Sequence, residues 1–318
     1  MAKQLLKNLI PLFFSIFIVE NIVAKSSFQD IQIYTTQNKD GKITPKSIEN
    51  TFESVGLSIV GNNNMNKPFL QRFKKVHYST YNLAMFVNND LSYRLLKKYP
   101  QFGALLPLTM SIWQDNNNNI NIATLTFHAM ARATKIPDTD PDLRAYAKLI
   151  NKALKKALPQ GSFKKLYNTP AHKENAFQIN FITHVNLNRE ENIENYIDDF
   201  EEEFEAEMES LGFLFPNITN VQEEIFDERN DKQYDFYHTY SICKFDVIYP
   251  VSKLHPAAGA WAPCSFYIYK KKDEDKMYMG FLGIRNWTTS LNITDNASIK
   301  PLQEAQGMIQ KIINDIIE

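Results

Sequence analysis

Pro100-Gln-Phe-Gly103-Ala-Leu-Leu-Pro107 recurs 156 residues later as Pro256-Ala-Ala-Gly259-Ala-Trp-Ala-Pro263. Upstream, Glu53-Ser-Val-Gly-Leu57 resembles Glu209-Ser-Leu-Gly-Phe213 at the same offset. Two separate matches at one offset indicate an internal duplication. The sequence therefore predicts two copies of one module, in which the prolines and glycines of the Pro-x-x-Gly-Ala-x-x-Pro motif form a structural turn.

A third match lies between these two, at a different offset. Tyr81-x-Leu83-x-x-Phe86 aligns with Tyr240-x-Ile242-x-x-Phe245 at an offset of 159. This alignment predicts a local slip of three residues between the copies.

The two copies predict the same order of elements. Each opens with a strand of alternating pattern, and a helix follows that stops at Gly56 in the first copy and, after a longer run, at Gly212 in the second. Each copy closes with an amphipathic helix. Antiparallel strands are expected between these helices, near 74–86, 108–114 and 119–127, and near 234–245, 264–270 and 276–284. The pattern predicts an α+β fold of two tandem modules, each strand–helix–antiparallel strands–helix, with helices on one face of each sheet.

The length of 318 residues suits two domains behind an N-terminal signal. Lys3 and Lys7 precede an apolar stretch, and the small residue Ala24 suits a cleavage site. The stretch is short for a bilayer span, so a retained anchor is the less favoured alternative. We expect a signal peptide at 1–24, a first module at 25–160, a linker at 161–175 and a second module at 176–318. Localisation is then periplasmic, with no membrane span after cleavage.

Charge and motifs exclude several function classes. The 35 basic and 36 acidic residues leave no basic field for nucleic acid. The sequence has no Gly-rich phosphate loop, no G-x-S-x-G and no H-E-x-x-H. We expect no nucleic-acid partner and no cofactor, and enzymatic activity is the less favoured interpretation.

The duplicated turn resembles the domain-of-unknown-function 302 family. Leu106-Pro107-Leu108 and Ala262-Pro263-Cys264 lie where that family has its proline-led strand start, and the resemblance covers about 31–158 and 176–317. It implies a TATA-binding-protein-like module, strand–helix–four strands–helix, present twice. Single-module members of the family can pair as homodimers, which implies that the tandem modules pair as an intramolecular pseudo-dimer. The resemblance implies no activity, because a fold does not define a function.

The two cysteines, Cys243 and Cys264, lie at the end of one expected strand and the start of another. In an exported protein such a pair favours a disulfide, which would contribute about 3 kcal/mol. Two buried thiols are an alternative, because Cys264 is in phase with the core-facing Phe266 and Ile268. A redox or metal role is the third.

A candidate ligand pocket is placed at His238, Tyr240, His255 and Tyr267, in an aromatic-rich part of the second copy. Sheet packing is the simpler explanation for the aromatic residues. The two histidines and two cysteines are also zinc or copper ligand types. However, His238 and Cys243 are five positions apart on a strand and point to opposite faces, so no metal site is expected.

The acidic run from Asp198 to Glu209 interleaves with an apolar stripe. It is predicted to be the solvated face of a helix, and a cation or basic-partner site is the less favoured alternative.

Two function classes remain. The favoured one is an exported, non-catalytic module that binds an unknown small ligand or protein. The alternative is a thiol- or metal-dependent protein that uses Cys243 and Cys264. The second copy is the expected place of a site in either case.

Overall fold

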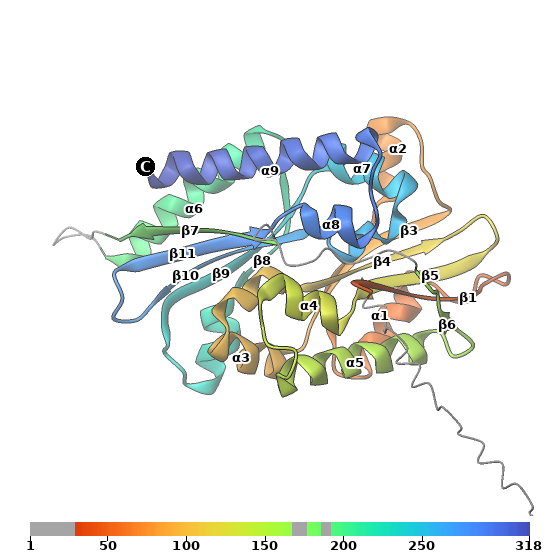
Figure 1. The fold of residues 1–318 in the computed structure, drawn as a ribbon, viewed down its shortest axis with the longest axis horizontal. Helices are drawn as coiled ribbons and strands as arrows, with labels where there is room; N and C mark the ends of the chain where they lie inside the picture. The colour runs from red at the N-terminus through yellow and green to blue at the C-terminus, as the bar shows by residue number, and fades with distance from the viewer. Residues whose placement is uncertain (1–28, 167–176, 186–191) are drawn as a thin grey trace, which may run out of the picture.

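The structure is a computed structural model that describes residues 29–166, 177–185 and 192–318. The expected signal peptide and residues 167–175 of the expected linker lie outside these ranges. The fold is α+β, with two antiparallel sheets and their helices in two modules (Figure 1).

The first module is built on a sheet of strand order β2-β3-β4-β5-β1-β6. Its elements are β1 (Ile31–Gln37), α1 (Pro45–Glu53), β2 (Ser58–Asn64), α2 (Asn66–Phe73), β3 (Thr80–Val87), α3 (Asn89–Lys98), the 3₁₀ turn η1 (Pro100–Leu105), β4 (Leu108–Gln114), β5 (Asn119–Leu125), α4 (Phe127–Thr134), α5 (Pro141–Ala157) and β6 (Ser162–Phe163). Strand β6 falls inside the expected linker and pairs with β1, so the sheet continues past the predicted module boundary.

The second module has the strand order β7-β11-β10-β9-β8. Its elements are β7 (Gln178–His184), α6 (Ile193–Ser210), β8 (Leu214–Asn220), the single turns η2 (Gln222–Phe226) and η3 (Asp227–Arg229), β9 (Tyr234–Cys243), α7 (Phe245–Leu254), the 3₁₀ turn η4 (Pro256–Ala260), β10 (Cys264–Lys271), β11 (Lys276–Leu282), α8 (Arg285–Ser290) and α9 (Asn296–Ile317).

The first helix of each module is delimited by local chemistry. Thr44 caps α1 in a capping box with Ser47, and Pro45 occupies the first turn, where its missing N–H costs nothing. Gly56 and Gly212 follow α1 and α6 with φ of +92° and +80°, which glycine adopts without a steric penalty. Both glycine stops were expected from the sequence.

The residue pattern did not predict strands β2 and β8, although the resemblance implied four strands between the two helices of each module. Both are edge strands in which exposed and half-buried residues alternate, and β2 carries three consecutive asparagines. An edge strand with little buried apolar surface gives a weak alternating signal.

The predicted three-residue slip is wrong. Phe86 pairs with Leu108 on β4, and Ile242 pairs with Cys264 on β10. Because Leu108 and Cys264 are related by the offset of 156, Phe86 and Ile242 are equivalent at that same offset. The Tyr–Leu–Phe match at 159 came from similar alternation in two strands rather than from equivalent positions.

Each sheet has its own helices on one face and the turn of the other module on the opposite face. Figure 1 shows α6 and α9 on one side of the molecule and α3, α4 and α5 on the other. Turn η1 packs on β10 and β11, and turn η4 packs on β4 and β5. The larger hydrophobic core runs through both modules, whereas a smaller one lies beneath α6 and α9.

Within the described ranges, no helix has the length and apolar character needed to cross a bilayer.

Candidate ligand-binding cleft between the modules

The duplicated turns interlock the two modules. The Tyr81 hydroxyl donates to the Pro256 carbonyl at 3.3 Å, and the Tyr237 hydroxyl donates to the Pro100 carbonyl. The two tyrosines are related by the offset of 156, as are the two prolines, so the contacts are reciprocal. The first residue of each motif therefore accepts a hydrogen bond from the other module.

The glycine of each motif lies where the opposite sheet comes closest. A Cβ at Gly103 would lie 2.8 Å from the Cβ of Tyr267, and a Cβ at Gly259 would lie 2.5 Å from the Cβ of Ser111. Real Cβ atoms essentially never approach that closely. These glycines are required by contact between modules.

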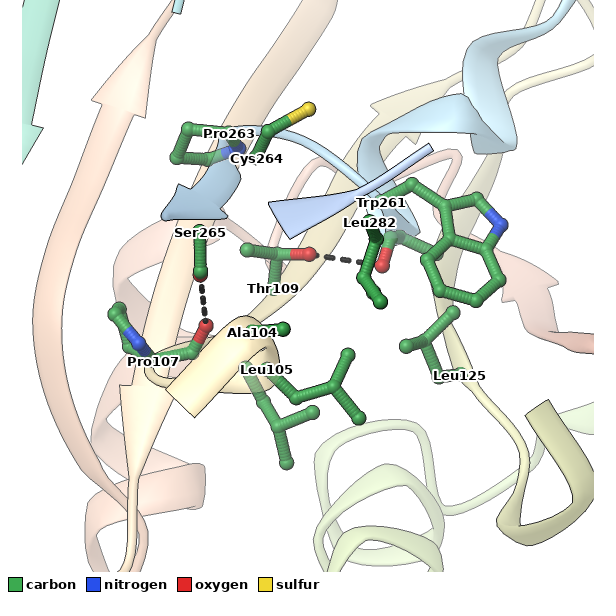
Figure 2. Close-up of a pocket in the computed structure, with 12 residues that line it drawn as sticks. Ala104, Leu105, Pro107, Thr109, Leu125, Trp261, Pro263, Cys264, Ser265 and Leu282 are labelled. Carbon is green, nitrogen blue, oxygen red and sulfur yellow. Dashed lines mark hydrogen bonds between the residues drawn. The ribbon is translucent and has the colours of Figure 1, made fainter. Parts of the chain in front are cut away.

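Two further hydrogen bonds between the modules lie beside the turns, and their donors, Thr109 and Ser265, are related by the offset of 156 whereas their acceptors are not. Figure 2 shows the Thr109 hydroxyl directed at the Ala260 carbonyl, 2.8 Å away, and the Ser265 hydroxyl directed at the Pro107 carbonyl, 3.4 Å away. The cavity among these residues is only about 10 Å³, at the lower limit of the ~10–15 Å³ that a single water molecule needs. This junction is therefore a structural contact and not a ligand site.

A larger cleft opens between the modules at their edge strands. Its volume is about 600 Å³, within the ~300–1,000 Å³ typical of small-molecule sites. Strand β2 and helix α2 form one wall, and α6, β8 and the start of α7 form the other. The lining residues are Asn63, Asn64, Met65, Pro68, Leu83, Glu205, Glu209, Leu214, Phe215, Pro216, Ile218, Cys243, Phe245 and Pro263.

The cleft combines an apolar surface with an acidic edge. Leu83, Phe215 and Phe245 belong to the apolar part, and the Phe215 ring lies 5.6 Å from that of Tyr240 beneath it. Glu205 and Glu209 supply two carboxylates from α6. None of the described residues that line the cleft is lysine, arginine or histidine, so its electrostatic potential favours a cation.

Glu205 belongs to a polar cluster under α6. Burial and then the nearby Glu201 carboxylate raise the pKa of Glu205, while the Tyr240 hydroxyl hydrogen-bonds it and opposes that rise. Burial, followed by Glu201 and Glu205, raises the pKa of Tyr240. The His238 ring contacts the Glu201 carboxylate at 2.6 Å. A positively charged ligand in the cleft would therefore contact the half-buried Glu205 carboxylate, which the Tyr240 hydroxyl of β9 holds in place.

The four residues of the predicted pocket do not converge on one site. His238 and Tyr240 lie on the face of the second sheet beneath α6, whereas Tyr267 lies on the opposite face against Gly103 and contacts Asn180 at 2.9 Å. His255 caps α7 and contacts Asp295 at 2.8 Å. Alternation along β9 and β10 separates Tyr267 from His238 and Tyr240, since neighbouring positions of a strand face opposite sides.

The predicted disulfide is wrong, because Cys243 and Cys264 are both free. Cys264 pairs across the sheet with Ile242, so Cys243 is one position out of register with it. Burial raises the pKa of each thiol to about 12. Within the described part of the chain, no group of three or more His, Cys, Asp or Glu side chains is arranged to hold a metal.

We expect both thiols to react slowly in the folded protein. A rise in pKa from 9.0 to about 12 lowers the thiolate fraction at pH 8 on the order of a thousandfold. Iodoacetamide labelling, followed by mass spectrometry, should add almost nothing to the native chain and two labels after denaturation without reductant. Labelling should accelerate as the pH rises toward 12. A denatured chain that takes no label would show a disulfide instead.

Sequence reasoning missed the cleft residues for identifiable reasons. Asn63 and Asn64 lie in an unexpected edge strand, and Phe215 lies in its counterpart. Glu205 and Glu209 belong to an acidic run that is mostly exposed, and the whole run was interpreted as the solvated face of a helix. One signal was present: Glu201, Glu205 and Glu209 are spaced i, i+4, i+8, which places them on one helix face.

The fold defines a duplicated α+β protein in which each module binds the turn of the other through reciprocal hydrogen bonds. A cleft lies between the edge strands of the two modules. The model of the family described as domain of unknown function DUF302 matches residues 33–158 and 190–316, and the chain belongs to that family as a tandem two-copy member. A solved structure, the uncharacterized conserved protein DUF302 from Bacillus stearothermophilus, is 18% identical, with a TM-score of 0.32, covering 40% of this chain and 96% of that one. No curated protein matches the sequence.

Proposed function

We propose that this chain is an exported, non-catalytic binding protein whose inter-module cleft holds a small cationic ligand with an apolar body. The observation that carries this proposal is the composition of the 600 Å³ cleft: two carboxylates, two asparagine amides, an apolar floor and no basic side chain among its described lining. A cation with an apolar body would satisfy the carboxylates and cover the exposed apolar surface. Export is proposed from the N-terminal signal pattern alone.

The reciprocal tyrosine and glycine contacts support the expectation that the two modules act as an intramolecular pseudo-dimer. A cleft with one wall from each module needs both walls held at a constant separation. The interlocked turns supply that rigidity, which reduces the entropy lost when a ligand binds.

The thiol- or metal-dependent alternative has less support. Thiolates are the metal ligands and nucleophiles, and burial opposes their formation at Cys243 and Cys264. The nearby histidines are engaged by Glu201 and Asp295.

We expect Glu205→Gln to weaken binding of n-butylamine by about tenfold, because it removes the half-buried carboxylate that pairs with the ammonium group. Isothermal titration calorimetry on the full chain measures this change. Glu202→Gln is the matched control, since Glu202 is exposed on the same helix. An unchanged affinity in Glu205→Gln, or no binding of butylamine to the wild type, would contradict the proposal.

The same binding should depend on pH in a defined direction. The pKa of Glu205 is raised, so its carboxylate takes up a proton at a higher pH than an ordinary glutamate. Amine affinity should therefore fall as the pH decreases through that raised pKa and be full above it. Glu205→Gln should remove this pH dependence.

A further inference from the structure

A second, smaller cavity lies directly behind the cleft. Its volume is about 60 Å³, and it lies between the second sheet and helices α7, α8 and α9. Cys243 and Pro263 line both this cavity and the cleft, so the two volumes meet at these residues. Phe281, Trp287 and Ile309 form much of its apolar interior.

The polar groups around this cavity are already engaged. The Lys244 ammonium donates to the Leu211 carbonyl and lies 4.8 Å over the Phe213 ring. The Gln306 side chain accepts from the Ile284 N–H at 2.9 Å and donates to Gln310 at 3.1 Å. The thiols of Cys243 and Cys264 are neutral and behave as small apolar groups. The side chains of Lys244 and Gln306 therefore need no partner from an occupant.

We propose that the small cavity behind Cys243 receives the apolar end of the ligand whose cationic group lies in the cleft. This inference rests on the proposed function and narrows it to one ligand class, a primary amine with a short unbranched alkyl chain. The lining is mostly apolar, so an alkyl chain that enters it leaves water for an apolar environment. The volume is several times the ~10–15 Å³ that one water molecule needs, which suits the end of an alkyl chain.

The proposal makes affinity depend on chain length. Each additional methylene that is buried should tighten binding about fourfold, until the cavity is full. Longer chains should gain nothing more, because a cavity of about 60 Å³ has no room for them. Trp287 is buried against the cavity and reports on its occupancy.

The test is calorimetric titration of the full chain with n-alkylamines from ethylamine to octylamine, with Trp287 fluorescence followed in parallel. Ala305→Leu fills the cavity from α9, and Gln303→Leu on the exposed side of the same helix is the matched control. We expect the length dependence in the wild type and in Gln303→Leu. Ala305→Leu should weaken hexylamine at least tenfold and leave ethylamine unchanged. The change in tryptophan emission should appear only with the longer amines and disappear in Trp287→Phe.

The possible failures are distinct. If all amines bind the wild type with equal affinity, give no change in Trp287 emission and are weakened alike by Glu205→Gln, the tail cavity is overturned and the cleft stands. If no amine binds, both proposals are overturned. The wild-type length series and its fluorescence decide the question even if Ala305→Leu fails to fold.

Discussion

Replacing Gly103 with alanine is expected to lower the free energy of unfolding by about 3 kcal/mol, at the upper end of the usual cost of overpacking. The added methyl group would lie 2.8 Å from the Cβ of Tyr267 and would also meet the Tyr237 hydroxyl. Tyr237 is fully buried and its ring packs 5.1 Å from Tyr234, so it has no space into which to withdraw. Gly259→Ala should have a similar effect, because its methyl group would lie 2.5 Å from the Cβ of Ser111.

The measurement is equilibrium urea unfolding, with Gly307→Ala as the control. Gly307 lies inside α9 and has no heavy atom within 4 Å of a built Cβ, so alanine should instead stabilise the helix by up to about 1 kcal/mol. Opposite signs for the two substitutions would separate contact between modules from backbone effects. A Gly103→Ala protein as stable as the wild type would contradict the interlock.

The duplication and its turn motif were readable from the sequence, but the reason for the motif was not. Proline and glycine at fixed spacing indicate a turn without indicating what the turn packs against. Gly103 is required by Tyr237 and Tyr267, which belong to the other module, and no local pattern encodes such a contact. The edge strands β2 and β8 could not be found from the residue pattern for a related reason, since half-exposed strands carry little periodic signal.

The candidate site was even harder to predict from local sequence patterns. A cleft between modules depends on how two surfaces face each other, and Asn63 and Glu205 come from different modules. The predicted His238, Tyr240, His255 and Tyr267 were grouped by closeness in sequence. Strand alternation placed Tyr267 on the opposite face from His238 and Tyr240, and His255 lies off the sheet at the end of α7. Only the acidic helix carried usable information, through the four-residue spacing of its half-buried glutamates Glu201 and Glu205.

A buried ion pair joins α4 to the residue that precedes β1. A single substitution in this pair should also lower the stability of the protein substantially. Arg132 contacts the Asp30 carboxylate, which is only 1% exposed. The Ser290 hydroxyl of the second module also donates to Asp30, at 2.9 Å. The Arg132 guanidinium lies 4.2 Å over the Phe177 ring, so this pair also joins the two modules.

Arg132→Leu is expected to lower the free energy of unfolding by about 3–5 kcal/mol, because it leaves the Asp30 carboxylate buried without a cation. Most of that loss is the cost of an uncompensated charge, so Asp30→Asn in the same chain should recover a large part of it. A double-mutant cycle measured by urea unfolding tests this. The loss of unfolding free energy in the double variant should be about 2 kcal/mol smaller than the sum of the losses in the two single variants. Lys311→Leu is the control, since its pair with Asp315 is largely exposed and should contribute less than about 0.5 kcal/mol. Additive losses for Asp30 and Arg132 would show that the two side chains stabilise the junction independently and not as a pair.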